Sequence, residues 1–426
     1  MKKVFLLLMT FTHLITIKAQ YCIDDRFAQS AYFDELEIER DFNIQYGLAD
    51  DWFMDFPQPL LNTFDIAYPK LDVDPLEKRP FILFAHGGGF WGGEKEALGY
   101  HVTQLAEAGF VAASMNYRKG WLGSGDDCTG DPVSLSVAIS RAMQDIQACL
   151  RYITANADTY GIDTAQIFVG GESAGVYALM NGLYMTEEEW SAIHPTHVAD
   201  YGSLFTSTNN LTNTFTVKGI INMWGGMIDT AYMIDEPMIP MINFYGISDD
   251  VIPPTSGPIK YCDGYEVVYG SESMAQVLTN YNVCNVLHQN LFAGHEAYLP
   301  EYTSRNIACF VKKQLCESCS TEVINYAIPE CLVIEQETIA VANFKQESLT
   351  VAPNPANTLV SFKLPEAANA NSVISITNVA GSILDIDYTI SGNYVILNVA
   401  TLPSGIYAAT VLGDNSIATG NFVVAH

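Results

Sequence analysis

Apolar runs rich in Val, Ile and Phe recur along the middle of the chain, separated by polar turns. Six of these runs predict β-strands, and they cover residues 81–86, 111–118, 167–170, 217–224, 241–246 and 285–293. Between them, apolar residues at helical spacing predict helices over residues 96–108, over residues 134–155 and from residue 174 onward. Strands that alternate with helices are typical of a mostly parallel sheet with helices on both faces. The pattern therefore predicts an α/β fold.

The segments around this central pattern predict edge strands and an insertion. Residues 36–46 and 61–68 predict antiparallel strands at the edge of the sheet. Residues 186–216 follow the third predicted helix and are rich in aromatic, Thr, Ser and Asn residues. A stretch of about thirty residues is long for a surface loop. We therefore expect residues 186–216 to form an inserted cap or lid.

The character of the chain changes after Cys331. Charged residues become fewer, helical spacing disappears, and short Val, Ile and Thr runs are separated by Asn, Gly and Pro. We therefore expect a main domain over residues 21–322, a linker over residues 323–347 and a small all-β sandwich over residues 348–426.

Residues 1–20 have the features of a secretory signal peptide. Lys2 and Lys3 precede an apolar run, and the segment ends at the small-residue boundary Ala19-Gln20. The apolar run is too short to cross a bilayer, so we expect no stable membrane span.

The charge balance restricts the partners of the protein. The chain has 20 basic and 48 acidic residues, which gives a net charge of −28. A surface of this sign repels polyanions. Nucleic acid is therefore excluded as a partner.

The cysteines indicate an oxidising compartment. All nine follow the predicted signal peptide, and disulfides persist outside the cytosol. Spacing alone does not determine their pairing. The local candidates are Cys128 with Cys149, Cys262 with Cys284, and Cys309 with Cys316 or Cys319. The odd number leaves one thiol unpaired.

Residues 171–175 provide a candidate nucleophile. They read Gly-Glu-Ser-Ala-Gly, and they lie between the predicted strand 167–170 and the start of a predicted helix. A serine on a tight turn between strand and helix is the arrangement of a nucleophile elbow. The flanking glycines let the two backbones approach closely. The candidate nucleophile is Ser173.

A glycine-rich loop provides candidate oxyanion donors. His-Gly-Gly-Gly-Phe at residues 86–90 directly follows another predicted strand. Glycines expose their backbone N–H groups, which can stabilise the negative oxygen of a tetrahedral intermediate. We assign the N–H groups of Gly88, Gly89 and Ala174 to an oxyanion hole.

These motifs, together with Asn-Tyr-Arg at residues 116–118 and Tyr-Gly-Ile-Asp at residues 160–163, resemble those of a known family. The sequence over residues 60–315 resembles the carboxylesterase and hormone-sensitive-lipase branch of the α/β-hydrolase superfamily. The resemblance implies an α/β-hydrolase fold with a cap insertion, and ester hydrolysis that needs no cofactor or metal. It also implies a catalytic triad in the chain order Ser, acid, His.

The acid and the base are sought after Ser173. Asp249 matches the position of the family's acid loop, with Asp250 and Asp229 as alternatives. His295 matches the family's Ala-Gly-His pattern, whereas the alternative, His288, lies within a predicted strand. Asp249 and His295 therefore complete the expected triad.

Other residues near the predicted strand ends have supporting roles. We expect Arg118 to form a structural ion pair, with Asp145 as the candidate partner. Four aromatic residues are candidates for the wall of an acyl or aryl pocket, namely Phe90, Trp91, Trp121 and Trp224.

The expected activity is that of a secreted serine carboxylic ester hydrolase that forms an acyl-enzyme. The smaller esterases that the sequence resembles include enzymes for acetylated or feruloylated plant polysaccharide. The expected substrate is thus a small-molecule or polymer-linked ester. The alternatives are a serine peptidase of the same fold and a binding protein that has the hydrolase fold without turnover.

The C-terminal region carries three motifs in order, at residues 351–356, 376–381 and 402–407. They resemble those of the type A sorting domain of the type IX secretion system in Bacteroidota. This resemblance covers residues 348–426 and implies the type IX machinery as a partner. It also implies export through the periplasm and outer membrane to the cell surface or the medium.

A carbohydrate-binding sandwich is the alternative for this region. It would need an aromatic platform, for which the predicted strands supply only Tyr388, Tyr394 and Tyr407.

Overall fold

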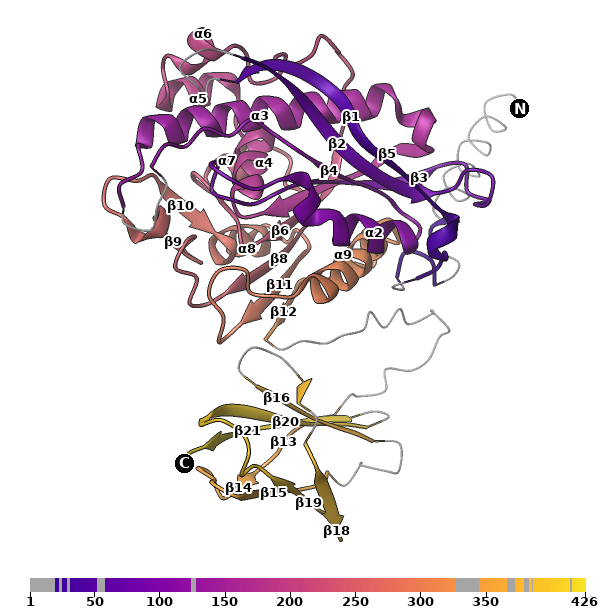
Figure 1. Cartoon of the computed structure of the whole chain (residues 1–426), viewed down its shortest axis with the longest axis vertical. Helices are drawn as coiled ribbons and strands as arrows, with labels where there is room; N and C mark the ends of the chain where they lie inside the picture. Colours follow the sequence, from indigo (N-terminus) through magenta and orange to yellow (C-terminus); the bar gives the residue numbers. More distant parts are fainter. Residues whose placement is uncertain are drawn as a thin grey trace, which may run out of the picture. The chain divides into compact units, whose positions relative to one another are not determined.

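A computed structural model describes residues 20–22, 25–28, 31–51, 58–123, 128–325, 345–365, 372–378, 383–384, 386–413 and 416–426. The chain divides into two compact units, Met1–Val333 and Ile334–His426 (Figure 1). The predicted signal peptide lies outside the described residues except for Gln20, and so does most of the predicted linker.

The first unit is built on a nine-stranded sheet with the strand order β1-β2-β4-β3-β5-β6-β8-β11-β12. Its strands are β1 (Ile38–Asp51), β2 (Gln58–Pro69), β3 (Arg79–Ala85), β4 (Val111–Met115), β5 (Ile162–Glu172), β6 (Val217–Met223), β8 (Met241–Gly246), β11 (Asn285–Asn290) and β12 (Glu322–Ile324). β2 runs antiparallel to both of its neighbours, and every other adjacent pair is parallel. The mostly parallel sheet and the six central strands that the sequence predicted are thus confirmed.

Two expectations about the limits of this sheet are corrected. β2 lies between β1 and β4, so it is not an edge strand; the antiparallel pairing was predicted, but not the pairing of β2 with β4. At the other edge, β12 pairs with β11. The sheet therefore extends past residue 322, where the main domain was expected to end.

Helices cover both faces of the sheet. They are α2 (Gly99–Glu107), α3 (Pro132–Ala155), α4 (Ala174–Tyr184), α8 (Ser271–Asn280) and α9 (Pro300–Leu315). In Figure 1, α3 and α4 lie on one side of the sheet, and α2 and α9 lie on the other. A small separate sheet contains β7 (Gly226–Met227), β9 (Ser256–Pro258) and β10 (Val267–Gly270).

β3 shows why the central strands are apolar at every position. Phe81, Leu83 and Ala85 belong to a hydrophobic cluster that contains residues of α3 and α4. Ile82 and Phe84, whose side chains alternate with these, belong to a second cluster with residues of α2 and α9. Both faces of the strand are therefore buried, which an uninterrupted apolar run satisfies.

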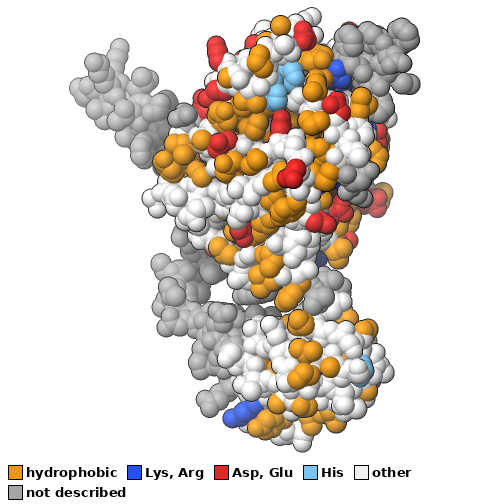
Figure 2. Space-filling view, turned by 90° about the vertical axis from the view of Figure 1, so that its left-hand side faces the viewer, with side chains coloured by type: hydrophobic (Ala, Val, Ile, Leu, Met, Phe, Trp, Pro, Cys, Tyr) orange, Lys and Arg blue, Asp and Glu red, His pale blue; other side chains and the backbone are white. Residues whose placement is uncertain are grey.

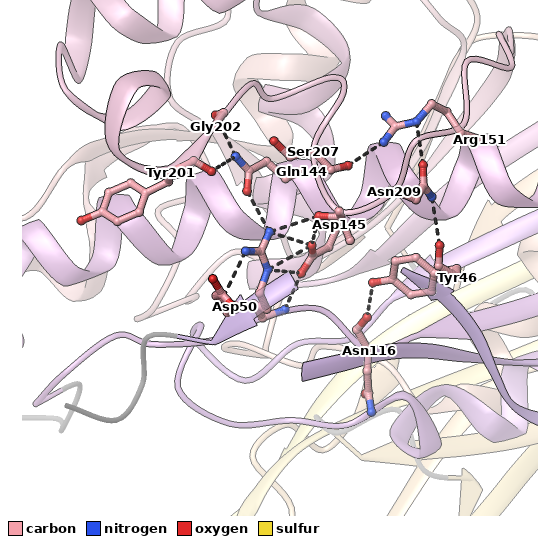
Figure 3. A network of polar contacts seen from close by, with 12 residues as sticks. Tyr46, Asp50, Asn116, Gln144, Asp145, Arg151, Tyr201, Gly202, Ser207 and Asn209 are labelled. Atoms are coloured by element: carbon pink, nitrogen blue, oxygen red, sulfur yellow. Dashed lines mark hydrogen bonds and ion pairs between the residues drawn. The ribbon is translucent and has the colours of Figure 1, made fainter. Parts of the chain in front are cut away.

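Residues 186–216 contain two short helices, α5 (Glu187–Ile193) and α6 (His197–Tyr201). Polar side chains of α3 hold the segment that follows them (Figure 3). The Gln144 amide donates to the carbonyl oxygens of Tyr201 (3.0 Å) and Gly202 (2.9 Å). Arg151 donates to the carbonyl oxygen of Ser207 (2.7 Å). These contacts attach this part of the insertion to α3.

Arg118 and Asp145 form the ion pair that the sequence predicted. The Arg118 Nε atom lies 3.1 and 3.0 Å from the two carboxylate oxygens of Asp145, and a terminal nitrogen lies 2.9 Å away. The exposed fractions of the two side chains are 5% and 0%. Thr208, from the insertion, also donates to this carboxylate (2.8 Å).

The disulfides join segments that are far apart in the sequence. They are Cys22–Cys316, Cys128–Cys262 and Cys284–Cys319, and Cys309 is also disulfide-bonded. Cys149 is a buried free thiol inside α3. The local pairs of Cys128 with Cys149 and of Cys262 with Cys284 were therefore wrong, and so was the pairing of Cys309 with Cys316 or Cys319. Proximity in the folded chain, not proximity in sequence, sets the distances between thiols.

The second unit contains only β-strands among its described residues. One sheet has the order β13-β21-β20-β16-β17 and the other has the order β14-β15-β19-β18. The strands are β13 (Lys345–Ser348), β14 (Val351–Ala352), β15 (Leu359–Lys363), β16 (Val373–Asn378), β17 (Ile383–Leu384), β18 (Tyr388–Ser391), β19 (Tyr394–Asn398), β20 (Gly405–Gly413) and β21 (Ser416–Val424). Phe362 and Leu397 from one sheet share a buried cluster with Ala409 and Phe422 from the other. This is the all-β sandwich that the sequence predicted. Among the described helices of the chain, none is long and apolar enough to cross a membrane.

We predict that Arg118→Met lowers the free energy of unfolding by about 3–5 kcal/mol, because it leaves the Asp145 carboxylate buried without its cation. The adjacent Lys119→Met is the matched control. Lys119 pairs with Glu94 at a site where the two side chains are 24% and 59% exposed, so its loss should cost about 1 kcal/mol or less. Urea denaturation of both variants measures these values. Equal losses would contradict a structural role for the buried pair.

Candidate active site

Ser173 lies between the last residue of β5 and the first residue of α4. Its backbone has φ 47° and ψ −116°. A positive φ is uncommon for a residue with a side chain, and such strain is often found at functional sites. Its N–H donates to the Met223 carbonyl oxygen at the end of β6 (2.9 Å). The turn is therefore held in place by the neighbouring strand.

The two glycines that flank Ser173 permit a close approach of three backbone segments. A Cβ atom on Gly171 or on Gly175 would overlap the carbonyl oxygen of Ala85 at the end of β3. Any other residue at these positions would push the turn away from β3. The glycines thus bring Ser173 next to the loop that follows β3.

The structure brings Ser173, His295 and Asp249 together. The Nε2 atom of His295 lies 2.9 Å from the Ser173 Oγ atom. On the other side of the ring, Nδ1 lies 2.8 and 3.0 Å from the Asp249 carboxylate oxygens. Because a carboxylate only accepts hydrogen bonds, Nδ1 carries the ring proton and Nε2 is free to accept the proton of Ser173. The three side chains follow β5, β8 and β11, at the carboxyl ends of parallel strands.

Asp249 is held by its own loop. Its Oδ1 atom accepts hydrogen bonds from the N–H groups of Val251 (2.9 Å) and Ile252 (2.8 Å). Its side chain is only 2% exposed. These N–H groups compensate for the loss of water around the carboxylate and fix its orientation.

The alternative acid and base candidates make different contacts from those of Asp249 and His295. Asp250 is exposed, and the Asp229 carboxylate accepts a hydrogen bond from the Ala231 N–H group. His288 is buried, and its ring stacks on Phe244 and bonds to the Tyr302 hydroxyl (2.6 Å). Burial lowers the pKa of His288 to about 3. His288 is therefore a neutral histidine of the core.

The predicted oxyanion loop lies beside Ser173. A Cβ atom built on Gly87 would lie 3.5 Å from the Ser173 Cβ. Gly88 and Gly89 have φ values of 107° and 59°, which suit glycine. No described residue accepts a hydrogen bond from the N–H groups of Gly88, Gly89 or Ala174. These three predicted donors are thus without an acceptor within the described part of the chain.

His86 anchors the start of this loop, a role that sequence reasoning missed. Its Nδ1–H donates to the Gly87 carbonyl oxygen (2.7 Å), and its ring stacks on Tyr117. The Tyr117 hydroxyl donates to the His86 carbonyl oxygen (2.7 Å). Burial lowers the pKa of His86 to about 4, so the ring is neutral near pH 7. The Asn-Tyr-Arg motif, which includes Tyr117, was the signal in the sequence for this contact.

Most of the predicted pocket aromatics are packing residues. Phe90, Trp121 and Trp224 are 3%, 3% and 5% exposed, whereas Trp91 is 58% exposed. A Cβ atom on Gly89 would lie 3.2 Å from the Trp91 ring. Only Trp91 of the four therefore offers an open aromatic face beside the loop.

Two hollows lie along the insertion. One, of about 490 Å³, is lined mainly by residues 183–188 and 203–206; the other, of about 540 Å³, is lined by residues 45–48 and 206–210. Neither is lined by Ser173, Asp249 or His295.

We predict a pH-dependent stability difference at Glu172, the residue before Ser173. Burial raises the pKa of Glu172 to about 7, and the charge of Glu296 adds to the effect. The unfolded chain ionises this group above about pH 4.5, while the folded chain keeps it neutral until about pH 7. The native state therefore loses stability as the pH rises through this range.

Glu172→Gln removes this loss. In urea denaturation, the variant should gain stability over the wild type between pH 4.5 and 8, by at most about 3 kcal/mol. Glu296→Gln, the control, should give a smaller gain, because the charge of Glu296 is the minor cause. Parallel pH profiles for wild type and Glu172→Gln would contradict a raised pKa at Glu172.

Comparison with protein families gives two matches along the chain. Residues 64–243 match the BD-FAE family, and residues 350–425 match the secretion system C-terminal sorting domain. The first match includes the glycine loop and Ser173, whereas Asp249 and His295 lie beyond its end.

Some of the curated relatives that match are esterases by name, and others, such as the neuroligin-like protein glit-1 of Caenorhabditis elegans, are not. Gut esterase 1 of Caenorhabditis elegans is 31% identical over 115 residues, which cover 26% of this chain and 19% of that relative. Fumonisin B1 esterase of Sphingopyxis macrogoltabida is 32% identical over 108 residues, which cover 25% of this chain and 20% of that relative. The chain thus spans about a fifth of the length of these relatives.

The chain is also similar to solved esterase structures. Esterase 2 of Thermogutta terrifontis, phosphorylated by paraoxon, has a TM-score of 0.42 at 17% identity, and 65% of this chain and 93% of that chain are covered. The two family matches agree with the observed folds of the two units. The chain therefore has an α/β-hydrolase fold with a region that matches the BD-FAE family, followed by a region that matches the secretion system C-terminal sorting domain and indicates type IX export to the cell surface or the extracellular space.

Proposed function

We propose that the first unit is a serine carboxylic ester hydrolase with Ser173 as nucleophile, His295 as general base and Asp249 as the orienting acid. One observation carries this proposal: His295 Nε2 lies 2.9 Å from Ser173 Oγ while Nδ1 is bound to Asp249. This chain of contacts is what a serine nucleophile requires. A binding protein without turnover would not need all three side chains at hydrogen-bond distance from one another.

The reaction proceeds in two steps. First, His295 takes the Ser173 proton as Oγ bonds to the ester carbonyl carbon, and the carbonyl π electrons move onto the oxygen. The N–H groups of Gly88, Gly89 and Ala174 donate to this oxyanion, and each such donor contributes a factor of about 10²–10³ to the rate.

The tetrahedral intermediate then collapses, and the C–O bond to the alcohol breaks. The imidazolium of His295 gives its proton to the departing alcohol, and the acyl group remains on Ser173. In the second step, water attacks the acyl carbon while His295 takes a proton from it; the bond from that carbon to Ser173 Oγ then breaks, His295 returns the proton to Oγ, and the carboxylic acid leaves.

We propose uncharged acetyl, feruloyl or other short acyl esters as substrates, either free or linked to a polysaccharide. Three of the four candidate aromatics are buried, so Trp91 is the one that can contact an aryl group. Acidic side chains are scattered over the face in Figure 2, and basic ones are few. A strongly anionic ester would be repelled by such a surface. The type IX machinery is the proposed partner of the second unit.

We expect Ser173→Ala to remain folded and to lose ester hydrolysis by about three orders of magnitude or more, because the nucleophile is absent. Hydrolysis of p-nitrophenyl acetate and of methyl ferulate by the purified mature chain measures this loss. Ser318→Ala, which changes an exposed serine after α9, is the control and should keep full activity.

Near-normal turnover by Ser173→Ala would refute the proposed nucleophile. The amides of the same acyl groups distinguish the peptidase alternative. Because esters are intrinsically more reactive than amides, turnover of the amides by the wild type that is lost in Ser173→Ala would identify a peptidase.

We also expect Asp249→Asn to lower kcat by about 10³- to 10⁴-fold, because the amide no longer orients and stabilises the His295 ring. Asp250→Asn is the matched control: this neighbouring carboxylate is exposed, so its change should cost less than about threefold. The reverse ranking would transfer the acid role to Asp250. Steady-state kinetics with a single ester give both values.

A further inference from the structure

The disulfide Cys128–Cys262 joins the two sides of the candidate active site. Cys128 lies in the segment between β4 and α3, and Cys262 lies between β9 and β10. The bond closes a separation of 134 residues, with a Cα–Cα distance of 5.4 Å. The first segment contacts the oxyanion loop, and the second contacts the acid loop.

Gly120 and Trp121, which precede Cys128 in the chain, pack on the oxyanion loop. The N–H groups of Gly120 (2.7 Å) and Trp121 (3.1 Å) both donate to the carbonyl oxygen of Phe90, the residue after Gly89. The buried Trp121 ring lies 4.0 Å from where a Cβ atom on Gly89 would be. A shift of this segment would therefore be transmitted to the backbone of Gly89.

The segment that leads to Cys262 packs on the acid loop. The Lys260 N–H donates to the Val251 carbonyl oxygen (2.8 Å), and the Tyr261 hydroxyl donates to the Asp249 carbonyl oxygen (3.2 Å). Val251 also donates its own N–H to the Asp249 carboxylate. The two residues before Cys262 thus hold the residue that orients His295.

This second segment needs an external constraint. Lys260 and Tyr261 have φ values of 53° and 54°. Two successive residues with side chains in the left-handed region are strained, and such a conformation persists only where the surroundings impose it. The disulfide at the next residue supplies one such constraint.

Contacts between the two segments add to the covalent bond. The N–H of Gly130 donates to the Tyr265 hydroxyl (2.6 Å), and the Tyr265 ring meets the Trp121 ring edge-to-face at 5.4 Å. The Lys260 ammonium group lies 5.9 Å from the Trp121 ring. The two segments therefore behave as one unit that spans the site.

We propose that the Cys128–Cys262 disulfide is a positioning crosslink for the reaction: it sets the Asp249 loop, and through it His295, relative to the oxyanion donors. This inference rests on the proposed esterase function. It assigns the two cysteines no contact with substrate. Misplacement of reacting groups by about 1 Å costs about 10²-fold in rate, so opening the crosslink should act on kcat.

The test compares two disulfides in the full mature chain. Cys128→Ser with Cys262→Ser opens the crosslink, and Cys284→Ser with Cys319→Ser opens a disulfide next to the starts of β11 and β12. The triad follows the carboxyl ends of the parallel strands, whereas this control disulfide lies at their amino ends. Urea denaturation of each variant defines conditions in which all are folded, and kinetics on p-nitrophenyl acetate are measured there.

We expect the first variant to lose about 10- to 100-fold in kcat with KM changed by less than about threefold. The control should keep kcat within about twofold. Equal kcat values for the two variants would overturn the inference, and so would a change confined to KM, because the crosslink would then shape binding rather than the triad.

Tyr261→Phe provides the test if the first variant does not fold. It keeps the disulfide and removes only the hydroxyl that holds Asp249, so kcat should fall about threefold at unchanged KM; an unchanged kcat would then overturn the inference. A wild-type chain that hydrolyses no ester would refute the proposed function, and this inference with it. If the wild type is active and opening the crosslink leaves kcat unchanged, only the inference is refuted.

Discussion

The candidate site depends on the close approach of β3 to the turn that carries Ser173. Gly171 and Gly175 leave room for the Ala85 carbonyl oxygen, which a Cβ atom at either position would meet. This approach places the glycine loop after β3 next to the serine. This backbone contact thus brings the proposed nucleophile next to the proposed oxyanion donors.

The parallel sheet supplies the rest of the arrangement. β5, β8 and β11 point in the same direction, so the loops after them meet at one edge. Asp249 and His295 come from two of these loops, 76 and 122 residues after Ser173. Buried pairs such as Arg118–Asp145 then fix the surrounding helix and insertion. A rigid frame suits the proposed reaction, in which His295 must stay within hydrogen-bond distance of both Ser173 and Asp249.

The sequence predicted those features that depend on contacts between residues close together in the chain. Ser173 and the glycine loop stand in short motifs whose residues touch one another, and the pattern of buried strands follows from the two apolar faces of the sheet. The different surroundings of Asp249 and Asp250 are visible only in the structure, because adjacent residues point in different directions. The Asp249 carboxylate accepts hydrogen bonds from N–H groups of its own loop, and Asp250 is exposed to solvent.

Features set by long-range contacts were not predictable in this way. Cys22 and Cys128 bond to partners 294 and 134 residues away, and no local spacing indicates such pairs. The position of β2 inside the sheet depends on its pairing with β4, and the burial of Trp121 and Trp224 depends on segments that fold over them.

The central claim, that His295 activates Ser173, is tested most directly by mass spectrometry after reaction with a p-nitrophenyl phosphonate. We predict one adduct per chain, on the peptide that carries Ser173, formed at least about 10³-fold more slowly in His295→Ala. An adduct on another residue, or equal labelling of the two proteins, would contradict this claim.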